Sequence, residues 1–141
     1  MNTPFLLMAL TLALPLAGCG QARSSATPPL AGAAIGGPFA LTDQDGRPRT
    51  DRDFAGKWRI MYFGYTFCPD VCPTDVATIA AALKKVEVAD PKRGAAIVPV
   101  FITVDPERDT PKVLKSFVAA FHPRLVGLTG TPDAIGRVEK E

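Results

Sequence analysis

The sequence has few of the residues that mark several common functional classes. Of its 141 residues only one is histidine and three are cysteine, an odd number that cannot all pair within one chain. The 16 lysines and arginines nearly balance the 14 acidic residues, and no basic run exists, so the electrostatic footprint of a nucleic-acid-binding protein is absent. The length allows one domain rather than two, and 47% hydrophobic residues exclude a disordered tail.

The first 22 residues carry no charged side chain. Within them, Phe5–Leu16 is an apolar run of 12 residues, which matches the core of a signal peptide and falls short of the roughly 20 residues that cross a bilayer. The run ends in Leu16-Ala17-Gly18-Cys19, which resembles the lipobox of bacterial lipoproteins, although the usual basic residue near the start is missing. The alternative is an ordinary signal peptide that contains a cysteine near its end.

The lipoprotein interpretation divides the chain into three segments. We expect residues 1–18 to be a lipoprotein signal peptide, residues 19–36 a flexible tether that begins at lipidated Cys19, and residues 37–141 the folded domain. The tether is poor in large apolar side chains, which is typical of a linker. The protein is therefore expected to be exported and held by its lipid on the periplasmic or extracytoplasmic face of a membrane.

Beyond the tether, hydrophobic patterning predicts alternating strands and helices. In order, we expect a reversal at Asp45-Gly46, a buried strand over 58–65, a helix over 74–88, a buried strand over 95–104, a helix opening at Thr110-Pro111, a strand over 125–128 and a helix from Thr131-Pro132 to the last residue. Pro99 predicts a bulge or a late start in the second strand. This order predicts an α/β fold with a parallel sheet and right-handed crossovers.

Two cysteines, Cys68 and Cys72, lie where the first predicted strand gives way to the first helix. The crevice at the carboxyl ends of parallel strands is where α/β proteins bind ligands. A helix N-terminus at that place favours a thiolate over a thiol, and Pro69 stiffens the loop between the two cysteines. Their C-x3-C spacing is one residue longer than the C-x-x-C of thioredoxin-like redox proteins.

Three interpretations of this pair remain open on the residues alone. Paired thiolates select soft metal ions such as Cu(I). A redox pair would use Cys68 as the nucleophile and Cys72 as the resolving thiol. A structural disulfide would close so short a loop that it gains little stability. A tetrahedral zinc site is disfavoured, because with Cys19 assigned to export no third cysteine or second histidine is left.

Four ordered motifs carry a resemblance to a known family. Residues 63–74 (FGYTFCPDVCPT) resemble the signature of the Sco/SenC family, and three further stretches match in order over roughly Ile35 to Glu141: Gly37-Pro38-Phe39 with its Asp45-Gly46 turn, residues 101–111 (FITVDPERDTP) and residues 127–131 (GLTGT). The family consists of membrane-tethered proteins of thioredoxin-like fold that deliver copper to the CuA centre of cytochrome c oxidase. The resemblance thus implies a three-layer thioredoxin-like domain whose partner is cytochrome c oxidase subunit II.

The resemblance also implies roles for the cysteines. Cys68 and Cys72 are expected to be copper ligands that present Cu(I), and they are expected to cycle between dithiol and disulfide. We therefore expect a metallochaperone rather than an enzyme. The alternative is a thiol-disulfide oxidoreductase or peroxiredoxin-like reductase that uses the same pair.

One departure from the family pattern concerns the third copper ligand, a histidine on a later segment. The sequence ends at Glu141 before reaching it, and three parallel strands with a hairpin leave one sheet edge open. We expect a fold that is incomplete at the C-terminus, without its closing strands and third-ligand segment. We further expect weakened Cu(I) binding and poor Cu(II) binding, since Cu(II) prefers more ligands, including nitrogen or oxygen.

His122, the single histidine, precedes the residues 127–131 and does not match that ligand. It is expected to act as a donor or cation near the carbonyls at a helix end. Asp109 and Thr110 are expected to cap the helix after the second strand, with Glu107 and Arg108 in solvent. Tyr65 and Phe67 are expected to line the pocket around the cysteines.

Overall fold

The structure, a computed structural model, describes residues 32–33 and 35–141, so the predicted signal peptide, Cys19 and most of the tether lie outside the described residues. Residues from 35 onward belong to one structural unit. Its elements are β1 (Ala40–Asp43), β2 (Pro48–Thr50), the 3-10 helix η1 (Asp51–Phe54), β3 (Trp58–Gly64), α1 (Val71–Ala89), α2 (Pro91–Ala96), β4 (Ile97–Thr103), α3 (Pro111–Ala119), β5 (Val126–Thr129) and α4 (Pro132–Val138). In this part of the chain, none of the helices is both long and apolar enough to cross a membrane.

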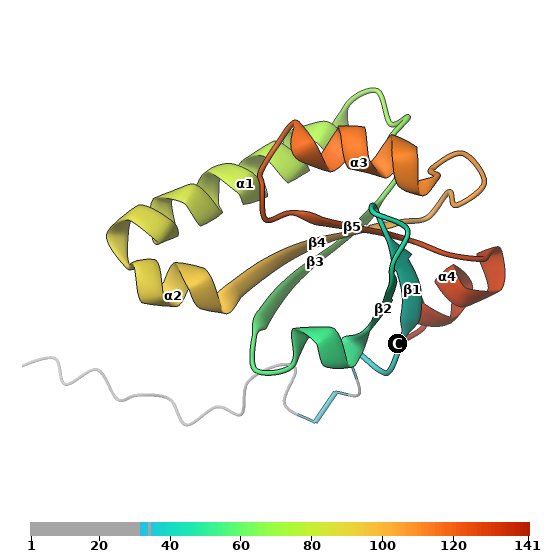
Figure 1. Cartoon of the computed structure of the whole chain (residues 1–141), viewed down its shortest axis with the longest axis horizontal. Helices are drawn as coiled ribbons and strands as arrows, with labels where there is room; N and C mark the ends of the chain where they lie inside the picture. Colours follow the sequence, from blue (N-terminus) through green and yellow to red (C-terminus); the bar gives the residue numbers. More distant parts are fainter. Residues whose placement is uncertain (1–31, 34) are drawn as a thin grey trace, which may run out of the picture. The chain divides into compact units, whose positions relative to one another are not determined.

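The strands form one mixed sheet in the order β2-β1-β5-β4-β3 (Figure 1). Strands β3, β4 and β5 run parallel, as the alternating pattern predicts, and β1 pairs antiparallel with both β2 and β5. The reversal between β1 and β2 contains Gly46 with a φ of 77°, a conformation that glycine adopts without steric cost. The predicted hairpin and parallel strands are therefore confirmed.

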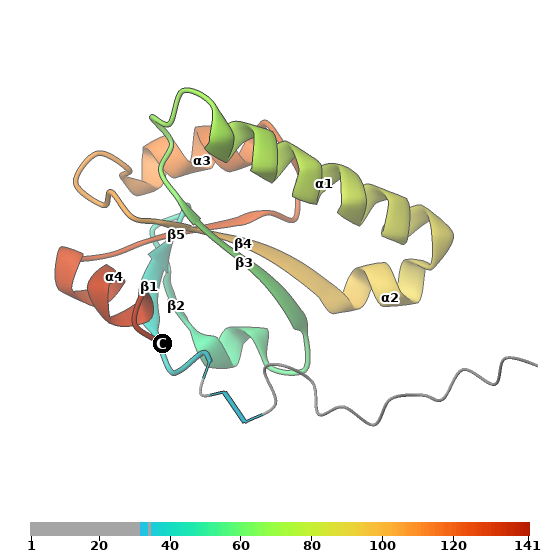
Figure 2. The same cartoon turned by 180° about the vertical axis from the view of Figure 1, so that it is seen from behind.

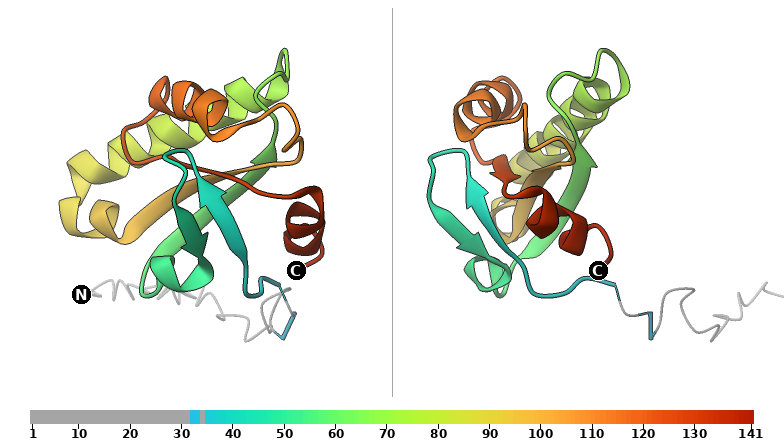
Figure 3. Two further views of the ribbon diagram at one scale, coloured as in Figure 1. Left: turned by 45° about the vertical axis from the view of Figure 1, so that its right-hand side comes forward. Right: turned by 90° about the vertical axis from the view of Figure 1, so that its right-hand side faces the viewer.

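Helices cover both faces of the sheet, which gives the predicted three layers. Helices α1 and α3 lie on one face and α4 on the other (Figure 2). Strand β4 lies between β5 and β3 and supplies both cores, because successive side chains point to opposite faces. Phe101 packs with residues of α1 and α3, whereas Val100 and Ile102 pack with residues of α4, β1 and η1. Two further views show α1 and α3 on the opposite side of the sheet from α4 (Figure 3).

Strand β3 differs from the prediction of a buried strand. It lies at the edge of the sheet, and Trp58, Ile60 and Phe63 are 76%, 38% and 40% exposed. Its aromatic and β-branched residues are typical of a buried strand, but burial depends on which neighbours the sheet provides. Within the described residues, β3 pairs with β4 alone.

Other boundaries also differ from those expected. Helix α1 begins at Val71, ahead of the predicted start, and α4 ends at Val138 rather than at the last residue. The short helix α2 was not predicted, because Pro91 and Gly94 interrupt its periodicity, yet Pro91 suits the first turn of a helix. Pro99 causes no bulge: its pairing with Ile60 continues the ladder.

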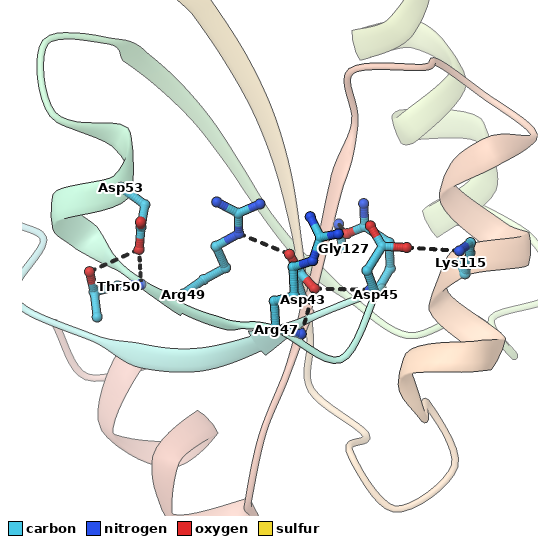
Figure 4. A network of polar contacts seen from close by, with 9 residues as sticks. Asp43, Asp45, Arg47, Arg49, Thr50, Asp53, Lys115 and Gly127 are labelled. Atoms are coloured by element: carbon cyan, nitrogen blue, oxygen red, sulfur yellow. Dashed lines mark hydrogen bonds and ion pairs between the residues drawn. The ribbon is translucent and has the colours of Figure 1, made fainter.

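Polar side chains fix the β1–β2 hairpin against the rest of the sheet (Figure 4). The buried carboxylate of Asp43 accepts hydrogen bonds from the backbone N–H groups of Asp45 and Arg47 and from Nε of Arg49, each at 2.9 Å. Lys115 of α3 binds Asp45 at 2.8 Å. These contacts hold the turn in place beside β5 and α3.

Candidate metal centre

Cys68 and Cys72 meet at the start of α1. Cys68 lies in the loop between β3 and α1, and Cys72 is the second residue of the helix. The backbone N–H of Cys72 donates to Sγ of Cys68 over 3.4 Å, and both cysteines are free thiols. The sulfur thus fills the position that a capping side chain usually takes, while the N-cap residue Asp70 makes no side-chain capping bond.

The surroundings of Cys68 favour its thiolate. Backbone N–H groups of Asp70 and then Cys72 lower the pKa of the Cys68 thiol, with the Cys72 side chain and Val71 acting in the same direction against a smaller effect of burial. These N–H groups belong to the N-cap residue Asp70 and to the first turn of α1, where unpaired donors and the helix dipole stabilise negative charge. The predicted effect of the helix N-terminus is therefore present in the geometry.

Cys72 packs against β3 through a glycine. A Cβ placed on Gly64 would lie 3.1 Å from Sγ of Cys72 and 2.8 Å from the ring of Tyr62, so the absence of a side chain there makes room for the sulfur. The hydroxyl of Tyr62 donates to Oδ2 of Asp75 at 3.0 Å. Burial, with the neighbouring Cys72 and Asp75, raises the pKa of Tyr62, so this phenol stays a hydrogen-bond donor.

The cysteines lie close to the surface but are mostly covered. Cys68 is 9% exposed and Cys72 is 5% exposed, whereas Val71 between them is 57% exposed. Phe67, one of the two residues predicted to line a pocket around the cysteines, is 56% exposed and does not enclose them. Instead the guanidinium of Arg108 lies 5.2 Å from the centre of the Phe67 ring and 5.9 Å from that of Tyr65.

The segment after β4 lies beside residues 65–70, the cysteine loop, as expected for two loops that follow adjacent parallel strands. Thr110 caps α3 through a bond from Val113 N–H to its Oγ1, which confirms half of the predicted cap. Asp109 does not cap that helix. Its buried carboxylate instead binds Thr66 and Thr103, which come from the cysteine loop and from β4. Arg108 forms an ion pair with Asp105.

His122 lies far from the cysteines. Its Nε2 is 3.3 Å from Oε2 of Glu87, and its Nδ1 accepts the backbone N–H of Arg124, so its side chain binds these groups rather than helix-end carbonyls. Glu87 lies near the end of α1 and Cys72 at its start, about 22 Å apart along the axis. Among residues 32–33 and 35–141, no group of three or more histidine, cysteine or acidic side chains is placed to hold a metal ion.

Two features of the site were not predicted from the sequence: the Tyr62–Asp75 bond and the role of Asp109. The strand order contained a signal for the second, since Thr66 and Asp109 follow neighbouring parallel strands and must emerge at one edge of the sheet. Two thiols at a helix N-terminus form, once deprotonated, a soft, anionic ligand pair, which suits a two-coordinate monovalent ion or thiol exchange.

Comparison with known proteins supports the family resemblance that the four motifs indicate. Residues 27–141 match the model of the SCO1/SenC family. The mitochondrial SCO1 homolog 1 of Arabidopsis thaliana is 50% identical over 108 residues, covering 77% of this chain and 31% of the relative. SenC of Rhodobacter capsulatus is 44% identical over 124 residues, covering 88% of this chain and 52% of the relative. The chain thus spans about a third of the first of these curated relatives and about half of the second.

A solved structure shows the same fold. The crystal structure of Arabidopsis thaliana ScoI with copper bound aligns with a TM-score of 0.70 and 48% identity, covering 76% of this chain and 65% of that chain. This likeness confirms the predicted thioredoxin-like α/β fold class. The family match, the sequence identities and the shared fold agree with the four ordered motifs: the chain belongs to the SCO1/SenC family.

Proposed function

We propose that this chain is a copper metallochaperone that binds Cu(I) on the thiolates of Cys68 and Cys72. The observation that carries the proposal is the hydrogen bond from Cys72 N–H to Sγ of Cys68, which brings both ligand residues together at the start of α1. The copper-bound structure of the Arabidopsis thaliana relative supports the choice of ion. We further propose that the recipient is the CuA centre in subunit II of cytochrome c oxidase.

The proposed transfer is a ligand exchange. Both thiols give up their protons when Cu(I) binds, and the lowered pKa of Cys68 makes the first loss favourable. Two thiolates and one monovalent ion leave a single negative charge, which the N–H groups of α1 stabilise. A thiolate of the recipient then adds to the ion as one of the two cysteines leaves it, and a second recipient thiolate displaces the other cysteine. No electron moves, because copper stays Cu(I) throughout.

We also propose that lipidated Cys19 holds the domain at the extracytoplasmic face of a membrane. The lipobox-like residues 16–19 support this, and one relative of known structure is a SCO1/SenC family lipoprotein from Bacillus anthracis. Its likeness to this chain has a TM-score of 0.65 and 31% identity, covering 75% of this chain and 63% of that chain. Cys19→Ser is expected to move the protein from the membrane fraction to the soluble fraction.

The same geometry favours a second candidate, thiol–disulfide exchange. The Cys68 thiolate would attack a substrate disulfide and release one substrate thiolate, and Cys72 would then attack the mixed disulfide and release the other. The products are a Cys68–Cys72 disulfide and a reduced substrate, with the two electrons supplied by the cysteine pair. The free state of both thiols and the lowered pKa of Cys68 favour this step.

Metal analysis after anaerobic loading separates the two candidates. The reduced protein is loaded with Cu(I), desalted and analysed beside Cys68→Ser, Cys72→Ser and the control His122→Gln. Copper delivery predicts one retained Cu(I) per chain, lost in either cysteine variant and kept in the control. Turnover of a disulfide or peroxide substrate that disappears in Cys68→Ser, with no copper retained by the native chain, would establish the second candidate instead.

A further inference from the structure

We propose that Asp109 is a positioning residue that holds the cysteine loop, residues 65–70, in its metal-binding shape. The expected effect on copper affinity rests on the proposed function. The positioning role itself is argued from hydrogen bonds alone. Asp109 lies outside the Cys68–Cys72 pair and touches neither sulfur. It acts through Thr66, two residues before Cys68.

Asp109 is completely buried, and both oxygens of its carboxylate accept hydrogen bonds. It is 0% exposed, Oδ2 accepts from the backbone N–H of Thr66 at 2.9 Å and from Oγ1 of Thr103 at 2.7 Å, and Oδ1 accepts from Oγ1 of Thr66 at 2.5 Å. One carboxylate therefore joins the end of β4, the cysteine loop and the residue before the α3 cap. Both loops lie at the same end of the sheet (Figure 1).

The polarity of this cluster requires a side chain whose two oxygens both accept hydrogen bonds. The hydroxyl of Thr103 accepts the backbone N–H of Asp105 at 2.9 Å, so its own hydrogen is free to point at Asp109. The Thr66 N–H can only donate. An amide in place of the carboxylate would aim an NH2 group at a donor and weaken the remaining bonds, since those to a charged acceptor are roughly twice as strong as neutral ones.

The rest of the loop gives the cysteines less support. Phe67, Pro69 and Asp70 are exposed, and the Cys68 N–H bonds locally to the carbonyl of Tyr65 at 3.2 Å. Two hydrogen bonds from Thr66 to Asp109 tie this loop to a residue 43 positions later in the chain. Loosening them would leave the Sγ of Cys68 free to drift from the Cys72 N–H, and thus separate the two ligands.

The chain supplies a matched control for the carboxylate. Asp43 is 1% exposed and also accepts three hydrogen bonds, but it lies in the β1–β2 hairpin (Figure 4). Asp43→Asn should therefore cost stability much as Asp109→Asn does without reaching the cysteines. Thr66→Ser keeps both donors of the native residue, whereas Thr66→Val removes the hydroxyl and keeps the shape.

The test measures Cu(I) affinity by competition with a chromogenic chelator, and amide hydrogen exchange of the copper-free chain by NMR, under conditions where every variant is folded. Asp109→Asn and Thr66→Val are expected to lower the affinity about ten-fold and to speed exchange at Cys68 and Cys72 by a similar factor. Asp43→Asn and Thr66→Ser are expected to match the native chain in both respects. If Asp109→Asn does not fold, Thr66→Val decides the result.

Native affinity and native exchange at the cysteines in Asp109→Asn or Thr66→Val would overturn the inference, as would an equal loss in Asp43→Asn. The outcome for the proposed function is separate. If the native chain retains no Cu(I), the copper proposal fails, and the positioning role is decided by exchange alone: faster exchange in Asp109→Asn than in Asp43→Asn supports it, and equal rates refute it.

Discussion

At the scale of single residues, the space around Cys72 depends on Gly64, which has no side chain and so leaves room for the sulfur. Gly64→Ala would place a methyl group 3.1 Å from Sγ of Cys72, 2.8 Å from the Tyr62 ring and 3.2 Å from the Phe101 ring. The core is closely packed, so we expect a loss of about 1–3 kcal/mol in the free energy of unfolding, together with weaker Cu(I) binding. Urea unfolding and chelator competition measure the two effects.

Gly136→Ala is the matched control, because nothing lies within 4 Å of the added Cβ and the residue sits inside α4. It should raise the stability by roughly 0.5–1 kcal/mol, as alanine favours a helix over glycine. A Gly64→Ala protein as stable as the native chain would contradict close packing of the Cys72 sulfur against Gly64.

The carboxylate of Asp43 makes stability depend on pH. Burial disfavours its charge, but hydrogen bonds from Arg47 N–H, the Arg49 side chain and Asp45 N–H outweigh burial and lower its pKa below the ordinary 3.8. A lowered folded-state pKa gives stability that is fully present above 3.8 and is lost as the pH falls through the folded value. Urea unfolding of the native chain and Asp43→Asn, from neutral to acid pH, measures this contribution.

Asp43→Asn should be less stable than the native chain at neutral pH, and the difference should shrink as the native carboxylate is protonated. A difference that stays constant down to well below 3.8 would mean that the charge of Asp43 makes no contribution.

At the scale of elements, Arg124 connects three of them. Its guanidinium binds Oε1 of Glu87 on α1 and the carbonyls of Gly94, Ala95 and Ile97 at the junction of α2 and β4. We expect Arg124→Ala to cost about 2 kcal/mol of unfolding free energy, since it removes hydrogen bonds that involve a charged donor. Thermal or urea unfolding measures the loss.

Arg124→Lys should recover little of that stability, because an ammonium cannot spread its donors over several carbonyls as a planar guanidinium does. The control is Arg137→Ala on the exposed side of α4, which should change the stability by less than about 0.5 kcal/mol. Equal effects at the two arginines would contradict the bridging role of Arg124.

The elements also show what the sequence could and could not predict. Local signals succeeded where the cause is local: Thr110 and Thr131 cap α3 and α4, each followed by proline, and Gly46 forms the hairpin turn. The meeting of Cys68 and Cys72 was predictable for the same reason, since one loop and one helix start hold both.

Predictions failed where the answer depends on residues distant in the chain. The exposure of β3 follows from its place in the sheet, which its own composition does not encode. Asp109 was expected to cap the helix beside it, yet it binds Thr66, a partner brought near by sheet topology. The contacts of His122 and Arg124 with Glu87 likewise join segments that are distant in the chain.

At the scale of the whole described unit, the β3 edge presents apolar surface. Trp58, Ile60 and Phe63 are exposed, and a cavity of about 280 Å³ is lined in part by Met61, Phe63 and Val138. Unpaired, apolar strand edges promote association between chains. We expect concentration-dependent self-association in sedimentation velocity, and its reduction by Ile60→Lys, which places a charge on that edge.

Val88→Lys is the control, because Val88 is also apolar and is 84% exposed but lies on α1. It should leave self-association unchanged. Equal suppression by the two substitutions would point to general surface charge rather than the β3 edge.

X-ray absorption at the copper edge of the anaerobically loaded, reduced chain tests the copper site most directly. We expect Cu(I) with two sulfur neighbours per ion, an unchanged spectrum in His122→Gln, and no retained copper signal in Cys68→Ser. Copper held by nitrogen or oxygen alone, or sulfur ligation that survives replacement of both Cys68 and Cys72, would contradict it.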